Sequence, residues 1–229
     1  MTYYTEKCMS AQIDIVALRE RIAEEEFDYQ TLMHALREYA GPRNRVTTLL
    51  DSGDIIRVKK GLYVFGQRLR RRPVSRELLS NLIYGPSYVS REYALRFHGF
   101  IPEQVHTITA MTTGRSRSFH TPLGAFTYTS IPLSAYPAGI VRKNAEDRSF
   151  FLAAPEKALA DQVYAHSNLQ LRSAGDIERY LLEDLRINAA DLQELRPSLL
   201  RKILATAASK RVQFLMNYLL RILEKTADE

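Results

Sequence analysis

Apolar side chains recur at helical spacing three times in the first fifty residues, and this pattern predicts three helices. The predicted helices cover about residues 11–26, 28–39 and 43–52. Asp28 suits the start of the second helix, because its side chain can accept a hydrogen bond from a free N–H group there. Gly41-Pro42 separates the second helix from the third, because proline fits the first turn of a helix. Gly53 follows the third helix as its left-handed terminal residue.

Two predicted strands come directly after these helices. Residues 55–58 and 62–65 are rich in β-branched and aromatic side chains, and Lys59-Lys60-Gly61 lies between them. A glycine between two such runs predicts a β-hairpin. Three helices followed by a hairpin with a basic tip are the order of a winged helix-turn-helix domain, which we place at residues 1–72. The polar segment 66–73 is predicted to be a linker.

The remaining residues, 73–229, predict a C-terminal mixed α/β domain that ends in a helical bundle. Short strands with glycine or proline turns occupy residues 84–152, and the pattern is helical over residues 155–225. The predicted strands are 87–89, 105–111, 118–121, 126–131, 139–141 and 150–152. The predicted helices are 75–82, 92–97, 156–165, 174–185, 189–195, 197–208 and 210–225. The expected fold class is therefore α+β, in two domains.

Positive charge is concentrated in the predicted helix-turn-helix. The chain carries 32 Lys and Arg against 26 Asp and Glu, a net charge of +6. Residues 41–76 have a balance of +8, whereas residues 1–40 have −4 and residues 77–229 have +2. A local positive surface on such a motif is typical of a protein that binds a phosphate backbone. The alternative is a solvated basic loop, which suits the arginines at 68–72 in particular.

The third helix is the expected recognition helix, because the second helix of a helix-turn-helix pair lies in the major groove of DNA. Its apolar side faces inward, which leaves arginine, asparagine and threonine side chains outward, and these types bind guanine, adenine, phosphate or the thymine methyl group. Basic residues at the hairpin tip suit the DNA backbone, as do the first residues of the second helix. The predicted DNA-binding residues are Tyr29, Gln30, Arg43, Asn44, Arg45, Thr47, Thr48, Arg57, Lys59 and Lys60.

Two groups in the second domain are candidates for a further surface. Arg115 and Arg117 form a basic loop that suits nucleic acid or an acidic partner, or else a polar turn at a sheet edge. Lys157 and Asp161 are four residues apart on a predicted helix, so we expect a surface ion pair there, with Lys157 available to a partner. Glu156 precedes them in the first turn, where an acidic residue is favourable.

An enzyme is the main alternative class, specifically a metal-dependent nuclease with a DNA-binding head. Such a metal site needs two or more carboxylates that converge on one ion. Glu156 and Asp161 are five residues apart, about 140° around a helix axis, and cannot easily chelate one ion together. His98, His106 and His120 have no ligand spacing, and no nucleophile, phosphate-loop or dinucleotide motif occurs. We therefore expect no catalytic residue, metal or cofactor.

Several stretches of the chain, in consistent order from about residue 27 to 187, resemble the AbiEi-like antitoxins of abortive-infection toxin–antitoxin systems. They include DSGDIIRVKKGLYVFG, YGPSYVSREYALRFHGF, FLAAPEKALADQVY and IERYLLEDLRI. The blocks Pro86–Ser90 and Pro155–Leu159 carry most of the likeness. Ala160 departs from it, since many relatives have cysteine there, and Arg91 and Arg96-Phe97-His98 are less typical.

The resemblance implies a winged-helix domain followed by an antitoxin domain. It further implies repression of the protein's own operon at an inverted repeat, and neutralisation of a nucleotidyltransferase-like toxin without a stable complex, as in type IV systems. Two copies on the repeat would form a homodimer on DNA. A stand-alone winged-helix regulator, or an interaction module whose last helix dimerises, remains an alternative.

The cellular location follows from weaker signals. No apolar run approaches the ~18 residues that a membrane span needs, and the first residues lack the layout of a signal peptide. Cys8 is the single cysteine, so no internal disulfide can form. We therefore expect a cytoplasmic protein without a membrane partner.

Overall fold

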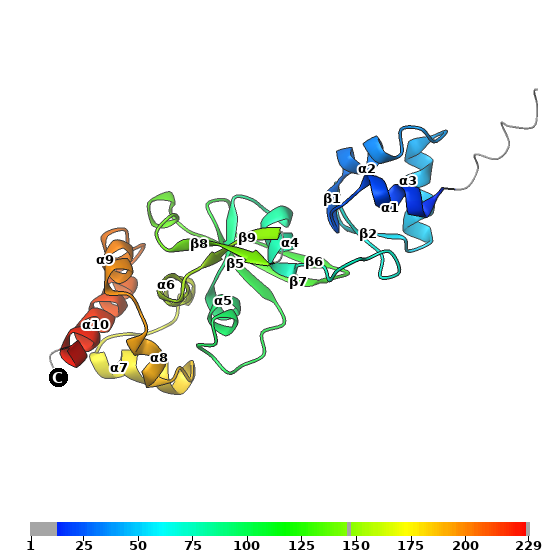
Figure 1. Ribbon diagram of the computed structural model, residues 1–229. Helices are drawn as coiled ribbons and strands as arrows, with labels where there is room; N and C mark the ends of the chain where they lie inside the picture. The colour runs from blue at the N-terminus through cyan, green and yellow to red at the C-terminus, as the bar shows by residue number, and fades with distance from the viewer. Residues whose placement is uncertain (1–12, 146–147, 228–229) are drawn as a thin grey trace, which may run out of the picture. The chain divides into compact units, whose positions relative to one another are not determined.

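The computed structural model describes residues 13–145 and 148–227. Cys8 and the first two residues of the helix predicted at 11–26 lie outside the described residues. The chain divides between Ser75 and Arg76 into two compact units, each with helices and its own sheet (Figure 1). The expected α+β class is therefore correct.

The first unit combines three helices with a three-stranded sheet. Its elements are α1 (Ile15–Arg21), β1 (Glu26–Asp28), α2 (Tyr29–Ala35), α3 (Pro42–Asp51), β2 (Ile55–Lys59) and β3 (Leu62–Phe65). The sheet is antiparallel, in the order β1-β3-β2. The helices close over it around a core that includes the fully buried side chains of Leu18, Leu32, Leu49 and Phe65.

Strand β1 was not expected, and it shortens the first helix. The helix predicted to reach residue 26 ends at Arg21, and Glu26 pairs with Val64 of β3 instead. The ring of Phe27 is buried 4.7 Å from the ring of Phe65, centroid to centroid. The ladder to β3 satisfies the backbone groups of this segment while the aromatic ring enters the core, and a longer helix would lose both.

The predicted cap of the second helix and both ends of the third are confirmed, whereas the second helix ends at Ala35 and not near residue 39. The Asp28 carboxylate accepts a hydrogen bond of 2.7 Å from the N–H of Thr31, which caps α2. Gly41 precedes α3 with a φ of 64°, Pro42 occupies the first turn, and Gly53 follows the helix with a φ of 71°. These positive φ values favour glycine, because a side chain would crowd the backbone there.

The segment 66–73, predicted to be a linker, makes several contacts with the first unit. The Arg68 guanidinium lies 2.9 Å from Asp54, and the Arg72 guanidinium lies 3.0 Å from Glu24. Arg70 donates to the carbonyl of Phe65, and the N–H of Arg71 donates to buried Glu25. Acidic residues of the first unit therefore hold this basic segment against it.

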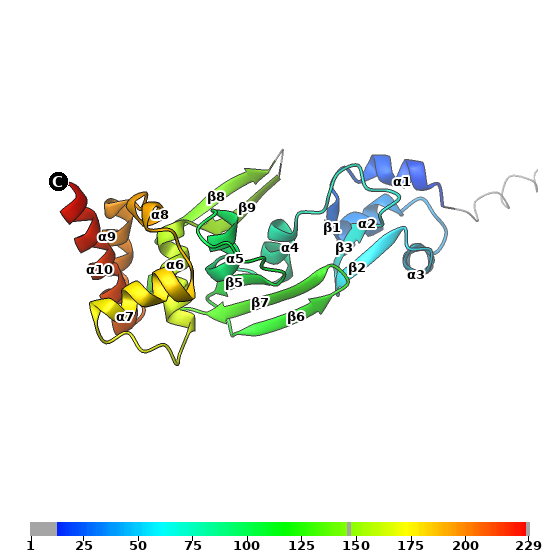
Figure 2. The same ribbon diagram turned by 90° about the horizontal axis from the view of Figure 1, so that it is seen from below.

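A mixed six-stranded sheet forms the centre of the second unit, in the order β6-β7-β5-β4-β9-β8 (Figure 2). The strands are β4 (Ser87–Val89), β5 (Ile108–Thr112), β6 (Arg117–Thr121), β7 (Gly124–Ser130), β8 (Ile140–Ala145) and β9 (Arg148–Ala153). Figure 1 shows α4 (Arg76–Ile83) on one face, with α5 (Arg91–Phe97) and α6 (Pro155–Ala165) on the other. Because helices cover both faces, every residue of the central strand β4 is buried.

The C-terminal helices pack beside α6. They are α7 (Ala174–Arg179), a π-helical turn η3 (Tyr180–Asp184), α8 (Ala189–Gln193), α9 (Pro197–Ala205) and α10 (Lys210–Ala227). A 3₁₀ turn, η2 (Leu133–Ala135), connects β7 to β8. The helix predicted at 174–185 is thus interrupted by the π turn. Val212, Leu215 and Leu219 of α10 are buried within the chain, so this stripe forms core rather than an open dimer seam. Over the described residues, no helix is both long and apolar enough to span a bilayer.

We predict that replacing Asp28 with alanine lowers the free energy of unfolding by about 1 kcal/mol, because α2 loses its N-cap. Hydrogen bonding from Thr31 holds the pKa of Asp28 below its usual range. This carboxylate therefore stabilises the fold fully above about pH 4, the unfolded value, and loses its effect as pH falls through the lower folded value. Chemical denaturation of D28A and wild type across pH 2–7 measures both effects.

Two further variants define the outcome. D28N keeps a capping side chain that does not titrate, so it should remain near wild-type stability at pH 7. D51A removes an exposed carboxylate from the C-terminal end of α3, where it does not act as an N-cap, and serves as the matched control. Equal losses in D28A and D51A would show that the cap contributes nothing.

Candidate nucleic-acid interface

The outer face of α3 carries most of the predicted base-contacting side chains. Arg43, Asn44 and Thr47 are exposed, whereas Val46 and Leu49 are buried beneath them. The 100° step between helical residues separates these two groups, as the sequence pattern predicts. Gly41 provides no side-chain cap to this ten-residue helix, but its carbonyl accepts hydrogen bonds from the N–H groups of Asn44 and Arg45 at 3.0 and 3.3 Å.

Arg45 and Thr48 lie on a different part of the helix from the other three. They line a cavity of about 350 Å³ between the start of α1 and α3, beside Ile15 and Asp54. Arg45 is half-buried, and the exposed Thr48 hydroxyl donates to the carbonyl of Asn44 at 3.2 Å. The structure therefore divides the five predicted α3 residues into an outward group of three and a pair beside this cavity.

The hairpin tip and the start of α2 are joined directly. The N–H of Tyr29 donates to the carbonyl of Gly61 at 3.0 Å, so Tyr29 and Gln30 lie next to Lys60. Tyr29, Gln30 and Lys60 are all exposed, as is Arg57 on β2. Lys59 is half-buried, and desolvation lowers its pKa. The predicted backbone-binding residues therefore form a continuous group around the tip.

The first unit contains a buried ion pair that the sequence pattern did not predict. The Arg19 guanidinium lies 2.5 Å from the Glu25 carboxylate and 4.5 Å from the centre of the Phe65 ring, and both charged side chains are almost fully buried. Arg19 also donates to backbone carbonyls of Ile22, Ala23 and Leu69. In the run Glu24-Glu25-Glu26, only Glu24 is exposed, and the other two residues are buried. An arginine five residues before an acidic run gives no local signal for this pairing.

Arg115 and Arg117 are exposed in the second unit, as expected. Arg117 begins β6, which is an edge strand of the sheet. Its guanidinium lies 5.5 Å from the centre of the Tyr84 ring, a cation–π distance that holds the side chain against the sheet. The basic loop is therefore a surface feature at a sheet edge.

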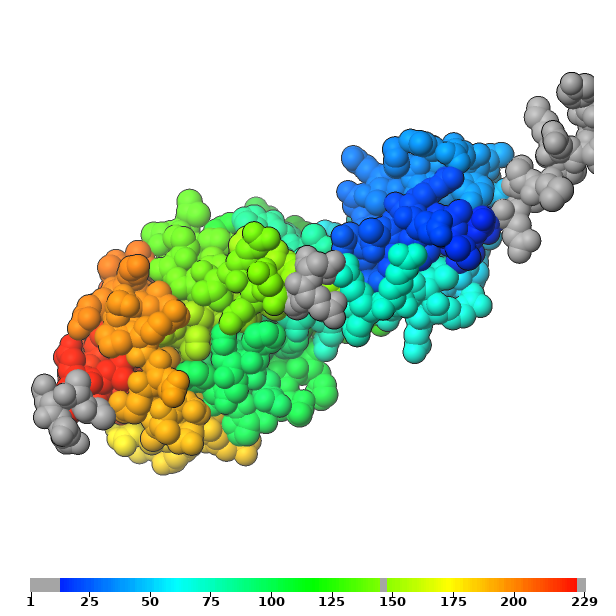
Figure 3. Space-filling view, viewed as in Figure 1, coloured from blue at the N-terminus to red at the C-terminus, as the bar shows by residue number. Residues whose placement is uncertain are grey.

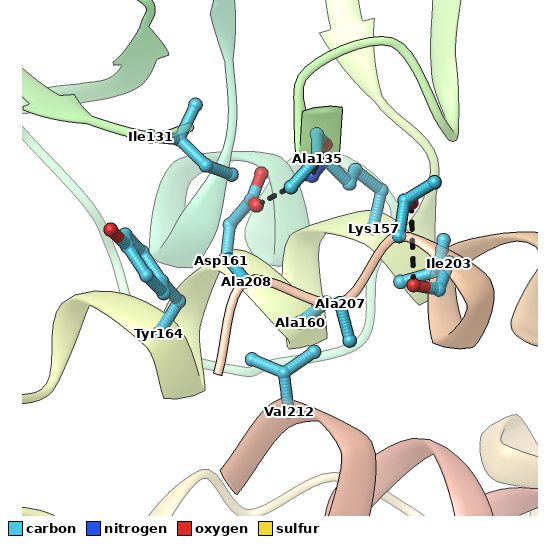
Figure 4. Close-up of a pocket in the computed structure, with 11 residues that line it drawn as sticks. Ile131, Ala135, Lys157, Ala160, Asp161, Tyr164, Ile203, Ala207, Ala208 and Val212 are labelled. Atoms are coloured by element: carbon cyan, nitrogen blue, oxygen red, sulfur yellow. Dashed lines mark hydrogen bonds and ion pairs between the residues drawn. The ribbon is translucent and has the colours of Figure 1, made fainter. Parts of the chain in front are cut away.

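Lys157 is not on the surface, and the expected surface ion pair with Asp161 is wrong. The Lys157 ammonium lies 2.9 Å from the Asp161 carboxylate, and the two side chains are only 2% and 1% exposed (Figure 4). Lys157 also donates to the carbonyl of Ala135 at 2.7 Å. Sequence spacing places the two residues on one helical face but does not show that β4, η2 and α10 cover that face. Lys157 therefore cannot serve as a surface contact in this structure.

Two hydroxyl groups from the central sheet complete this buried cluster. Ser90 and Tyr88 donate to the second Asp161 oxygen at 2.7 and 2.9 Å. Burial raises the pKa of the Asp161 carboxyl, while Lys157, Ser90 and Tyr88 act in the opposite direction. Burial and the Asp161 charge also raise the pKa of Tyr88 well above its usual range. The cluster thus ties α6 to β4 and η2 through a fully hydrogen-bonded carboxylate.

A strained residue follows this cluster directly. Arg91 has a φ of 60°, in the left-handed region that residues other than glycine rarely adopt. Its side chain contacts Gln162, Thr129 and Glu92 at 3.2 to 3.3 Å, which fixes the turn between β4 and α5. Strain of this kind persists only where the surroundings determine the conformation.

The carboxylates considered for a nuclease site do not converge. Glu156 accepts hydrogen bonds from the backbone and side chain of Arg196 at 2.8 to 3.2 Å, whereas Asp161 faces Lys157 on the other side of the helix. His98 bonds to the carbonyl of Ala153, and His106 and His120 are exposed elsewhere. Over residues 13–145 and 148–227, no three potential ligands among His, Cys, Asp and Glu gather closely enough to hold a metal ion.

The sequence matches no protein-family model in the comparison made, and no curated protein aligns with it. Function must therefore be inferred from the residues of this chain and from the arrangement described above.

We predict that D161A lowers the free energy of unfolding by about 3–5 kcal/mol, because it leaves the Lys157 ammonium buried without its partner. The double variant K157M/D161L removes both charges and should be more stable than D161A. Urea denaturation at pH 7 measures these differences.

The surface pair Arg201–Glu224, at 3.2 Å with both side chains about 60% exposed, is the matched control. R201Q should cost no more than about 1 kcal/mol, because solvent screens this pair. A D161A loss as small as that of R201Q would contradict the buried-pair interpretation.

Proposed function

We propose that this protein is a winged-helix DNA-binding regulator in which α3 enters the major groove and the β2–β3 hairpin is the wing. The support is topological first. The order α1-β1-α2-α3-β2-β3, with β1 added to the outer edge of the hairpin strand β3, is that of winged-helix domains. Residues 36–41 connect α2 directly to α3, and this succession supports the interpretation of the two helices as a helix-turn-helix pair.

The main observation behind the proposal is that only some of the basic side chains in the first unit form ion pairs with acidic residues. Arg68 and Arg72 are paired with Asp54 and Glu24, whereas exposed basic side chains remain at α3 and the hairpin tip. Part of the excess charge in residues 41–76 therefore lies on α3 and the hairpin, which supports contact of these surfaces with DNA. Arg68 and Arg71 are also exposed, so the segment 68–72 contributes to the surface charge as well.

Each group of residues has a role in this proposal. Arg43 and Asn44 bind base edges, because bidentate arginine and asparagine contacts distinguish guanine and adenine. Arg57, Lys60 and the first residues of α2 bind phosphates and fix the register. Two copies on an inverted repeat would form a homodimer on DNA, and their linked binding would raise occupancy. Such a regulator acts in the cytoplasm.

We further propose, from the AbiEi-like resemblance, that the regulator is an antitoxin and that its second unit neutralises a nucleotidyltransferase-like toxin. The resembling blocks Pro86–Ser90 and Pro155–Leu159 contain the residues of the buried Asp161 cluster or adjoin them. Their role is thus to maintain the fold of this unit, while exposed residues such as Arg115 and Arg117 are available for contact. The proposal assigns no catalytic residue or cofactor.

The affinity of the full chain for DNA should fall steeply as the salt concentration rises. Substitutions of base-contacting and of phosphate-contacting residues should have different effects on this affinity. N44A should cost about 1–3 kcal/mol on the promoter DNA of its own gene and little on random duplex, because base readout is lost. K60Q should weaken both equally and reduce the salt slope by about one, since it removes one phosphate contact. Fluorescence anisotropy at several salt concentrations measures these effects.

K202Q is the matched control for K60Q, because Lys202 is an exposed lysine on α9 in the second unit. It should bind DNA as the wild type does. Affinity that is flat with salt on both DNAs, or equal losses in K60Q and K202Q, would contradict the proposed interface.

Neutralisation should be separable from repression. Co-expression of the N44A variant with a nucleotidyltransferase-like toxin encoded beside this gene should restore growth as well as wild type does, because the second unit is unchanged. Promoter-fusion assays should show derepression by the same variant. Absence of rescue by wild type and variant alike would leave a DNA-binding regulator without antitoxin activity.

A further inference from the structure

A cavity of about 380 Å³ opens in the second unit at the N-terminal end of α6. Strand β8, the start of α6 and the segment before α9 line it, and in the space-filling view the orange α8–α9 region adjoins the green hairpin of β8 and β9 (Figure 3). Its volume lies within the range of small-molecule sites, about 300–1,000 Å³. No residue of the DNA-binding proposal lies in it.

The charge of the cavity wall is positive. Arg142, Lys143 and Arg196 line it, and the first two are exposed on β8. Glu156 is also in the wall, but both of its oxygens accept hydrogen bonds from Arg196 at 3.0 and 3.2 Å. Glu156 is almost fully buried and positions the guanidinium, whose side chain remains 56% exposed. Glu194 is the second acidic residue of the wall.

The start of α6 adds further hydrogen-bond donors. This helix has eleven residues, Pro155 occupies its first turn, and the preceding Ala154 provides no side-chain cap. The next N–H group, that of Glu156, belongs to the uncapped first turn, and Glu156 lines the cavity. N–H groups in that position and the helix dipole together favour an anion.

His98 and Phe100 line a further part of the cavity wall. The His98 ring lies 2.8 Å from the carbonyl of Ala153, and the charges of Lys143, Glu156 and Arg196 all act on it. Burial lowers the pKa of His98, which favours the uncharged imidazole. Phe100 and Val141 provide an apolar surface next to these polar groups.

We propose that this cavity binds a small phosphomonoester, such as a mononucleotide or a sugar phosphate. The phosphate lies at the start of α6 between Lys143 and Arg196, and the organic part packs against Phe100 and Val141. This site goes beyond the proposed DNA binding and is independent of it. Phosphate is favoured as the anion because its several acceptor oxygens match the N–H group at the start of α6 together with the Lys143 ammonium.

Isothermal titration of the full chain with adenosine 5′-monophosphate, glucose 6-phosphate, inorganic phosphate and adenosine tests the site. The phosphorylated probes should bind and raise the thermal midpoint, and adenosine should not. Binding by both organic phosphates defines a general phosphomonoester site, and binding by one alone identifies its source. Sodium chloride at equal ionic strength controls for screening.

K143Q should weaken binding of the phosphorylated probes about tenfold, which is the loss expected for one charge-assisted hydrogen bond. K202Q removes an exposed lysine outside the cavity and should bind them as wild type does. Because Lys143 is exposed, K143Q should fold normally, and its circular dichroism and thermal midpoint without ligand verify this.

Three results would overturn the proposal. They are no binding of any phosphorylated probe, equal affinities in K143Q and K202Q, and a K143Q defect confined to duplex DNA. The last result would assign Lys143 to the nucleic-acid surface. N44A should bind the phosphorylated probes normally, so failure of the DNA-binding proposal and failure of this one are distinguishable.

Discussion

A charge that is buried away from water must be paired and hydrogen-bonded, and each unit of this chain is arranged around one such pair. Arg19 and Glu25 form it in the first unit, and Lys157 and Asp161 form it in the second. Desolvation of either ion alone costs several kcal/mol, so the elements that supply its partners must stay in place. Apolar packing alone would tolerate small shifts of these elements, whereas the hydrogen-bond geometry of the pairs does not.

In the first unit this constraint also determines which positive charges remain available. Glu25 faces inward toward Arg19, and the same acidic run supplies partners to the basic segment that follows β3. Arg68 and Arg72 are thereby paired with acidic residues, while Arg43 of α3 and Arg57 of the hairpin stay exposed. The electrostatic surface is therefore a consequence of how the acidic run folds, and composition alone could not reveal it.

The sequence predicted the features that depend on near neighbours. Helical periodicity located α2 and α3, and Asp28, Gly41 and Gly53 act at their ends as expected. These signals are local, because a cap or a left-handed residue depends on a few bonds of adjacent backbone. The outward positions of Arg43, Asn44 and Thr47 follow from the same periodicity.

Features that depend on distant partners were not predictable in this way. Strand β1 exists because β3, almost forty residues later, supplies its ladder. The depth of Asp161 depends on Tyr88 and Ser90, which are 73 and 71 residues away in sequence. An i, i+4 lysine–aspartate pair has the same spacing on a surface helix and on a buried one. Only the tertiary fold distinguishes the two cases.

The two pairs also explain why the candidate sites lie where they do. A site needs side chains in fixed positions, and the hydrogen bonds of a buried pair hold the elements that supply its partners. In the first unit, the Arg19–Glu25 pair underlies the sheet that carries the hairpin tip. In the second, Lys157 and Asp161 hold α6, whose first turn lies at the wall of the cavity that we propose as a phosphomonoester site. The buried ion pairs thus hold in place the elements that carry positive charge at the surface.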